Sequence, residues 1–135
     1  MSDTSPNQTE LAPIGPIALS LSGGGFRAAG FHLGVLTVLQ RAGLLDQVRV
    51  LSTASGGTLL GARWLIGKVR GESFSDTHFE FAKYLQTAEP LRGAARRAAR
   101  ERLTLTQAIA EEFEEHLFDD SRFASPTLRE IFESR

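Results

Sequence analysis

The chain has 135 residues, a formal net charge of −1 and no cysteine. This length allows one small domain, and the absence of cysteine excludes disulfides, thiolate metal ligands and a catalytic cysteine. The nearly balanced charge argues against nucleic acid as a partner. Nothing in the composition indicates a metal or another cofactor.

The first residues differ in character from the rest of the chain. Residues 1–15 are polar and contain Pro6 and Pro13, so we expect them to form a flexible leader. They lack the charged and apolar regions of a secretory signal, and no apolar run reaches the roughly 18 residues that a membrane span needs. We therefore expect a cytoplasmic protein whose contact with membranes is at most peripheral.

Strands and helices alternate in the next part of the sequence. Ile17–Leu21 is a short apolar run before three glycines, which is typical of a buried parallel strand. A broad apolar face predicts a helix over Phe26–Arg41. A second strand is expected at Val48–Ala54 and a second helix at Thr58–Val69. This alternation predicts an α/β fold with a parallel sheet and covering helices.

Three glycines mark the first predicted helix. Gly30 and Gly34 lie one turn apart, which suggests that this helix packs closely on a strand. Gly43 follows the last periodic residue and is expected to cap the helix, with Leu44 making the usual apolar contact. The sequence thus predicts both the packing face and the end of this helix.

The residue pattern becomes less regular after the second predicted helix. Residues 75–91 predict an irregular helix, and residues 92–118 predict a long helical region whose first part is basic and whose second part is acidic. Ser125 and Pro126 together form a good helix start, so a last helix is expected from there. These segments carry no repeat and no low-complexity tract.

The basic part of the long helical region allows two interpretations. Arg92, Arg96 and Arg100 share one helix face by their four-residue spacing. They could contact anionic lipid headgroups, or they could simply form a solvated helix that pairs with the acidic residues that follow. The adjoining acidic stretch favours the second interpretation.

Two strand-to-helix turns are expected at one edge of the sheet. The glycine turn, Gly23–Gly25, follows the first strand, and the serine turn, Ser55–Gly57, follows the second. In a parallel sheet both turns emerge at the carboxyl edge, where ligands bind. Ser55 is placed like the serine of a nucleophile elbow. Backbone N–H groups near it could form an oxyanion hole: those of Gly23, Gly24, Gly25 and Gly56.

The serine turn departs from the usual elbow pattern G-x-S-x-G. Thr53 stands where the first glycine is expected, because the segment reads T-A-S-G-G. A serine in such a turn is often a plain turn residue. The glycine turn one crossover earlier is the observation that favours a catalytic role for Ser55.

Two segments carry a family resemblance. S-G-G-G-F-R-A-A-G-F-H-L-G-V-L at 22–36 and V-L-S-T-A-S-G-G-T at 50–58 resemble the patatin-like phospholipases, and F-R-A is similar to the cytosolic phospholipase A group. F-D-D-S-R-F-A-S-P-T-L-R-E-I-F at 118–132 also resembles the family. The resemblance implies a three-layer α/β/α acyl hydrolase fold, with residues 16–135 forming its N-terminal part. It also implies a serine hydrolase that cleaves ester bonds of lipids or phospholipids through a Ser–Asp dyad.

The resemblance also implies roles for individual residues. Ser55 would be the nucleophile, and the glycine turn would bind the oxyanion. Arg27 matches a basic residue thought to contact substrate phosphate, a role that suits the planar guanidinium group. An arginine in the first helical turn opposes the helix dipole, which favours a functional reason for it.

The acidic partner of Ser55 is not evident in the sequence. The family's aspartate belongs to an Asp-Gly motif, and no aspartate here precedes a glycine. His32, His78 and His116 show no triad spacing and are interpreted as packing or surface residues. Two strands are also too few for an independent sheet. We therefore expect the chain to be the N-terminal piece of a longer domain, inactive without the remainder that supplies the aspartate.

Two other functions fit parts of the sequence. The chain could be a relative that binds lipid or a partner without turnover, as Thr53 and the missing aspartate would allow. Alternatively, Gly23-x-Gly25-x-x-Ala28 fits the dinucleotide fingerprint of a Rossmann domain. That fold needs an acid at the end of the second strand, where this chain has T-A-S, and no Lys-Ser or Lys-Thr follows the glycines as a P-loop would require.

Overall fold

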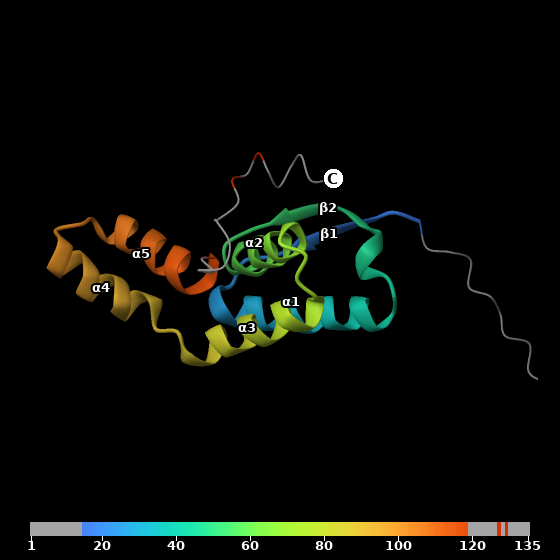
Figure 1. Cartoon of the computed structure of the whole chain (residues 1–135), viewed down its shortest axis with the longest axis horizontal. Coiled ribbons are helices and arrows are strands. Elements are labelled where there is room, and N and C mark those ends of the chain that lie inside the picture. The colour runs from blue at the N-terminus through green and yellow to red at the C-terminus, as the bar shows by residue number, and fades with distance from the viewer. Residues whose placement is uncertain (1–14, 119–126, 128, 130–135) are drawn as a thin grey trace, which may run out of the picture.

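The computed structural model describes residues 15–118, Thr127 and Arg129, and it consists of a two-stranded sheet and a series of helices (Figure 1). The predicted leader and the helix expected from Ser125 lie almost wholly outside the described residues. In chain order the elements are β1 (Ile17–Leu21), α1 (Gly25–Arg41), the 3-10 turn η1 (Leu45–Gln47), β2 (Val48–Thr53), α2 (Gly56–Val69), α3 (Phe74–Thr87), α4 (Pro90–Glu101), α5 (Leu105–Phe113) and the π-helical turn η2 (Glu114–Phe118).

The two strands pair in parallel, as the sequence predicts. Ala18 is opposite Val50 and Leu21 is opposite Thr53, with one irregularity in the register after Ile17. Both strands therefore end at the same edge of the sheet. The fold is α/β, and α1 and α2 leave the sheet from that common edge.

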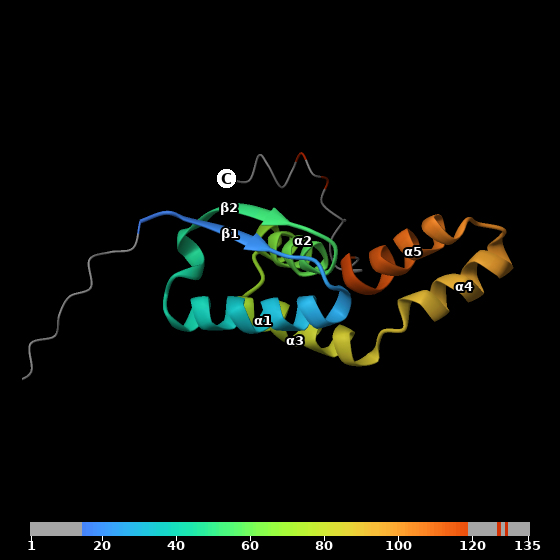
Figure 2. The same ribbon diagram turned by 180° about the vertical axis from the view of Figure 1, so that it is seen from behind.

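α1, α2 and α3 lie on one face of the sheet, whereas α4 and α5 extend to its side. Leu19, Leu21 and Leu51 point toward the helices and are buried or partly buried, whereas Ala18 and Val50 are exposed. Figure 1 and the view from behind in Figure 2 both show α1 and α3 on the same side of the strands. The described residues thus supply the sheet and one helical layer of the expected three-layer fold.

The core lies between α1, α2 and α3. Its fully buried apolar side chains come from the strand end and all three helices: Leu21, Leu36, Leu60 and Phe81. Tyr84 contacts this core and packs edge-on against the ring of Phe26 at a centroid distance of 5.7 Å. Phe26 directly follows the glycine turn, so the core extends up to the base of that turn.

The glycines of α1 are only partly as predicted. Gly43 has φ +68°, and the N–H of Leu44 donates to the carbonyl of Leu39 at 2.8 Å, which confirms the predicted helix cap. The predicted packing of Gly30 and Gly34 on a strand is wrong. A methyl group at Gly30 would meet Leu85 of α3, and one at Gly34 would meet nothing.

The long helical region expected at 92–118 is a hairpin of α4 and α5. Arg102 adopts the left-handed conformation, with φ 57° and ψ 34°, and so ends α4. Thr104 then starts α5 with a capping box in which its hydroxyl accepts from the Gln107 N–H. A matching box of Ser73 and Asp76 starts α3. Both boxes are present in the sequence as Ser/Thr followed three residues later by an Asp or Gln.

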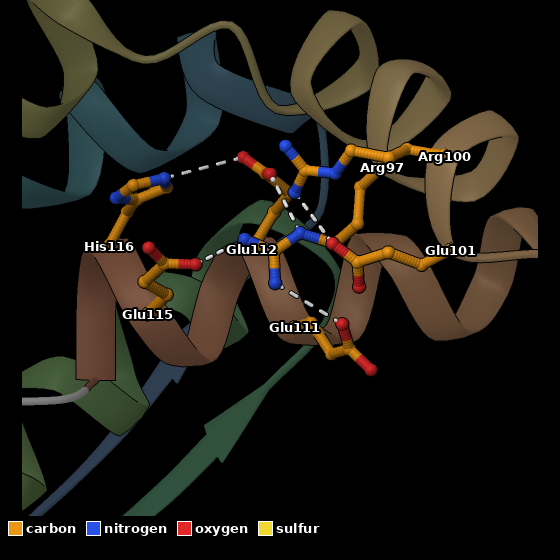
Figure 3. A network of polar contacts seen from close by, with 7 residues as sticks. All are labelled: Arg97, Arg100, Glu101, Glu111, Glu112, Glu115 and His116. Carbon is orange, nitrogen blue, oxygen red and sulfur yellow. Dashed lines mark hydrogen bonds and ion pairs between the residues drawn. The ribbon is translucent and has the colours of Figure 1, made fainter. Parts of the chain in front are cut away.

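Ion pairs hold the hairpin together (Figure 3). The Arg97 guanidinium lies 3.2 Å from a carboxylate oxygen of Glu111 and 3.4 Å from one of Glu112, and it hydrogen bonds Glu115. The hydrogen bond from Arg97 lowers the pKa of Glu115 below its usual value. The basic and acidic halves therefore pair through Arg97. Of the three arginines on the predicted face, Arg92 lies 3.1 Å from Glu89 and Arg100 lies 2.6 Å from Glu101, both outside the acidic half. Among residues 15–118, no helix has the length and apolar character needed to cross a bilayer.

Candidate active site

The glycine turn and the serine turn pack backbone against backbone. A Cβ atom on Gly56 would lie 2.1 Å from the Gly25 carbonyl oxygen, and one on Gly57 would lie 2.3 Å from the Leu21 carbonyl oxygen. Contacts this short leave no room for any side chain. The two glycines after Ser55 are therefore required by the close approach of the first turn.

Ser55 has a backbone conformation that side-chain-bearing residues rarely adopt. Its φ is 48° and its ψ is −119°, and the residue is exposed between the end of β2 and the start of α2. Such strain persists only where surrounding contacts fix it. Here the N–H of Ala54 donates to Leu21 O at 3.0 Å, and the N–H of Thr58 donates to Ser55 O at 2.8 Å. The result is a sharp strand-to-helix turn that exposes the serine hydroxyl.

The glycine turn borders Ser55 directly. A Cβ atom on Gly23 would lie 3.2 Å from the Ser55 Cβ and 3.9 Å from its Oγ. Gly24 and Gly25 have φ values of 140° and 63°, which favour glycine. Within residues 15–118, none of the backbone hydrogen bonds between the turns and their flanking elements uses the N–H groups of Gly23, Gly24 or Gly25.

Thr53 fits its place because a glycine faces it from α2. A Cβ atom on Gly61 would lie 2.7 Å from the Thr53 methyl carbon and 3.3 Å from Leu51. The Thr53 hydroxyl also accepts a hydrogen bond from the Thr58 hydroxyl at 3.1 Å. In the usual elbow, the glycine two positions before the serine gives the strand room to pack on the helix. Here Thr53 holds that position, and Gly61 on α2 provides the room instead. Thr53 is therefore compatible with a tightly packed elbow.

Comparison with known proteins identifies the family. A family model described as Patatin-like phospholipase matches residues 19–134, which includes both turns. The chain belongs to the patatin-like phospholipase family. Membership indicates a lipid acyl hydrolase. Comparisons with curated proteins and with solved structures gave no match.

Arg27 lies in the first turn of α1 of this patatin-like domain, two residues after the glycine turn. Its side chain is exposed, and within residues 15–118 it forms no hydrogen bond or ion pair. The guanidinium is therefore available to an anionic ligand near the turns.

The two aspartates that the structure describes make contacts away from the serine turn. Asp46 precedes β2, at the opposite edge of the sheet, and lies 3.7 Å from the Lys68 ammonium group. Asp76 caps α3. The remaining aspartates, Asp3, Asp119 and Asp120, lie outside the described residues. Within residues 15–118 the patatin-like domain thus brings no aspartate to the serine turn.

The three histidines have different surroundings. His32 is buried and its Nε2 lies 3.0 Å from the Ser22 carbonyl oxygen, a contact that the sequence did not indicate. His78 packs against Phe74 at a ring distance of 6.2 Å. His116 is exposed, 3.5 Å from Glu112. All three fit the interpretation as packing or surface residues, and the buried His32 also contacts the residue before the glycine turn.

A cavity of about 450 Å³ lies between α3, α4 and η2. Its lining includes Tyr84, Arg96, Glu112 and His116. The Tyr84 hydroxyl is buried without a hydrogen-bond partner among the described residues, and burial with the nearby Glu112 charge raises the pKa of Tyr84 to about 12. Basic and acidic side chains line the cavity together, so the lining favours neither anionic nor cationic ligands.

Proposed function

We propose that Ser55 is the nucleophile of a lipid acyl hydrolase and that the glycine turn binds the oxyanion. The observation that supports this most is the Ser55 backbone, with φ 48°, held in a strand-to-helix turn directly beside Gly23. A strained turn of this kind exposes the serine oxygen above the sheet edge. The α2 N-terminus behind it favours negative charge.

The reaction would proceed through an acyl-enzyme. The Ser55 hydroxyl attacks the ester carbonyl carbon, and its proton passes to a carboxylate base. The N–H groups of Gly23, Gly24, Gly25 and Gly56 stabilise the tetrahedral oxyanion, a contribution of about 3–4 kcal/mol for one donor in other enzymes. The ester C–O bond then breaks, the leaving alcohol takes the proton, and the acyl group remains on Ser55. Water releases the fatty acid by the same two steps.

We propose an aspartate as the base, forming a Ser–Asp dyad with Ser55. The described aspartates are engaged elsewhere, and the sequence contains no Asp-Gly pair. Because the family's aspartate precedes a glycine, the proposal includes an aspartate supplied from outside residues 1–135. Residues 1–135 alone would then lack the base and would not turn over substrate.

We propose phospholipid as the substrate class, with Arg27 contacting the phosphate. Its side chain is exposed, two residues after the glycine turn whose N–H groups are proposed to bind the oxyanion. A guanidinium can donate two parallel hydrogen bonds to a phosphate, which a neutral side chain cannot. Phospholipids lie in bilayers, so the proposal includes peripheral contact with a membrane surface.

The test is covalent labelling of the full-length native protein with a fluorophosphonate, which reacts with activated serines. We expect one label on Ser55 and none in the Ser55→Ala variant. Ser52→Ala is the matched control, since Ser52 is also exposed on β2, and it should label like the parent. Persistent labelling of Ser55→Ala would refute the nucleophile assignment.

The same experiment separates the proposal from a binding module without turnover. Such a relative would leave Ser55 unlabelled while the protein still bound phospholipid vesicles. The fit between Thr53 and Gly61 supports the catalytic interpretation over that alternative, because Thr53 then need not disrupt the elbow. Labelling of Ser55 would exclude that alternative.

A further inference from the structure

His32 makes an unusual contact for a buried side chain of α1. The residue is only 6% exposed, and its Nε2 lies 3.0 Å from the Ser22 carbonyl oxygen and 3.3 Å from the Ser22 hydroxyl. The ring of Phe31 packs against it edge-on at 5.5 Å. A side chain two turns into α1 is therefore bonded to the residue immediately before the glycine turn.

The shorter of the two contacts to Ser22, at 3.0 Å to the carbonyl oxygen, indicates which ring nitrogen of His32 carries the proton. A carbonyl oxygen can only accept, so the close contact to Ser22 requires a hydrogen on Nε2 of His32. With that hydrogen in place, Nε2 has no lone pair with which to take a proton from a serine. His32 therefore acts as a donor at this position, and it does not act as a general base through Nε2.

The position of Ser22 links this contact to the proposed active site. Ser22 is followed by Gly23, whose Cα borders the Ser55 side chain. Three successive glycines have more backbone freedom than any other run, so they need external contacts to hold one conformation. Within residues 15–118, His32 is the only side chain that hydrogen bonds the segment Ser22–Gly25.

We propose that His32 is a positioning residue that fixes the glycine turn against Ser55 through its hydrogen bond to the Ser22 carbonyl. The inference rests on the proposed function, because the positioned groups are the proposed oxyanion donors. Small misplacements of such donors lower the rate of reaction without weakening ground-state binding. His32 thereby acts on the chemistry through the turn and does not itself contact the substrate.

The first experiment measures the turn itself and does not depend on activity. Amide hydrogen exchange is followed by NMR in the full-length protein, for the parent, His32→Ala and His32→Gln. The reporters are Ala28, whose N–H donates to the Gly24 carbonyl at 3.4 Å, and Ala54, whose N–H donates to the Leu21 carbonyl at 3.0 Å. Loss of one buried hydrogen bond should speed exchange in His32→Ala by about tenfold. Glutamine can place an amide N–H near the position of the imidazole Nε2, so His32→Gln should stay within about twofold of the parent.

The second experiment measures the fluorophosphonate reaction at saturating and subsaturating probe. His32→Ala should lower the maximal labelling rate about tenfold with an unchanged probe half-saturation concentration. His32→Gln should restore the rate and leave its pH dependence unchanged. Ser22→Ala keeps the backbone carbonyl and should react like the parent. His116→Ala removes an exposed histidine and serves as the control.

The outcomes separate the two proposals. Faster exchange in His32→Ala without any labelling of the parent would refute the proposed function and leave the positioning of the turn intact. Equal exchange in His32→Ala and the parent would overturn the positioning role. If His32→Ala fails to fold, the proposal is tested on His32→Gln alone. A folded His32→Gln that is labelled tenfold more slowly than the parent would overturn the positioning role. A pH profile of labelling that loses one of its two arms in His32→Gln would overturn it as well.

Discussion

The two strand-to-helix turns and the α4/α5 hairpin are held together by different kinds of contact. At the turns, carbonyl oxygens of Leu21 and Gly25 occupy the space that side chains on Gly57 and Gly56 would need. In the hairpin, the partly buried Arg97 side chain joins three carboxylates, those of Glu111, Glu112 and Glu115 (Figure 3). Backbone contacts tolerate no added atom, whereas ion pairs between long, flexible side chains can rearrange. The proposed chemistry thus lies in the less tolerant region.

Gly56→Ala should have the largest effect on stability. The new methyl group would overlap the Gly25 carbonyl, and neither backbone can move alone, so we expect a loss of about 3 kcal/mol. Urea unfolding measures this loss. Gly34→Ala is the control, because its methyl group would meet nothing within 4 Å and should stabilise α1 by about 0.5–1 kcal/mol. Equal effects of both variants would show that the turns are not tightly packed.

Gly61→Ala should have the second largest effect, and a second change should relieve it. The added methyl group would lie 2.7 Å from the Thr53 methyl carbon, at a cost of about 2 kcal/mol. Thr53→Ala in the same chain removes that carbon and should recover about 1 kcal/mol. A double-mutant cycle by urea unfolding measures the coupling. Additive effects would mean that Thr53 and Gly61 do not compensate for each other.

Arg97→Met should destabilise the chain less than either glycine variant. The substitution keeps much of the apolar stem but removes the contacts to Glu111, Glu112 and Glu115. The loss should shrink as ionic strength rises, because salt screens exposed charges. Thermal unfolding at low and high salt measures it. Arg100→Met is the control, since Arg100 is far more exposed and pairs only with its neighbour Glu101 among the described residues.

The same ion pairs predict a pH dependence. Arg97 lowers the pKa of Glu115 from its usual 4.5, so the folded protein binds this proton less readily than the unfolded chain. The stabilisation is therefore present above pH 4.5 and is lost as the pH falls through the lower folded-state value. Unfolding curves between pH 6 and pH 3, in Glu115→Gln and the parent, should converge toward the acid end. A constant difference would contradict the pairing.

Arg27→Met should have the smallest effect on stability, within about 0.5 kcal/mol, because the side chain is exposed. Its proposed role predicts a functional effect instead. Hydrolysis of phospholipid by the full-length protein should fall about tenfold, while hydrolysis of an uncharged ester should not change. Equal losses on both substrates would argue against a phosphate contact.

The parts of the site that the sequence predicts are those carried by local signals. A short apolar run before glycines, followed by an apolar helix, predicted both turns and their common edge. The helices begin at Gly25 and Gly56, one or two residues before their predicted starts. Ser55 could be placed because glycines flank it on one side and a strand on the other.

The remaining parts depend on contacts between distant residues. Gly61 lies within an ordinary helical pattern, and its relation to Thr53 arises only when α2 packs on β2. His32 fits the buried face of α1, and nothing in the sequence indicates its bond to Ser22. The break in the 92–118 region depends on Arg102 in a left-handed conformation, which arginine rarely adopts.

The interlocked glycines have a consequence for how the serine turn can exist. The Ser55 conformation costs free energy, and the contacts that hold it combine hydrogen bonds within the serine turn with close packing against Leu21 and Gly25 around the end of β1. A peptide of residues 48–69 would relax to an ordinary turn. The strained Ser55 conformation therefore exists only while the glycine turn and the serine turn are packed together. Any local separation of β1 from β2 would let Ser55 relax.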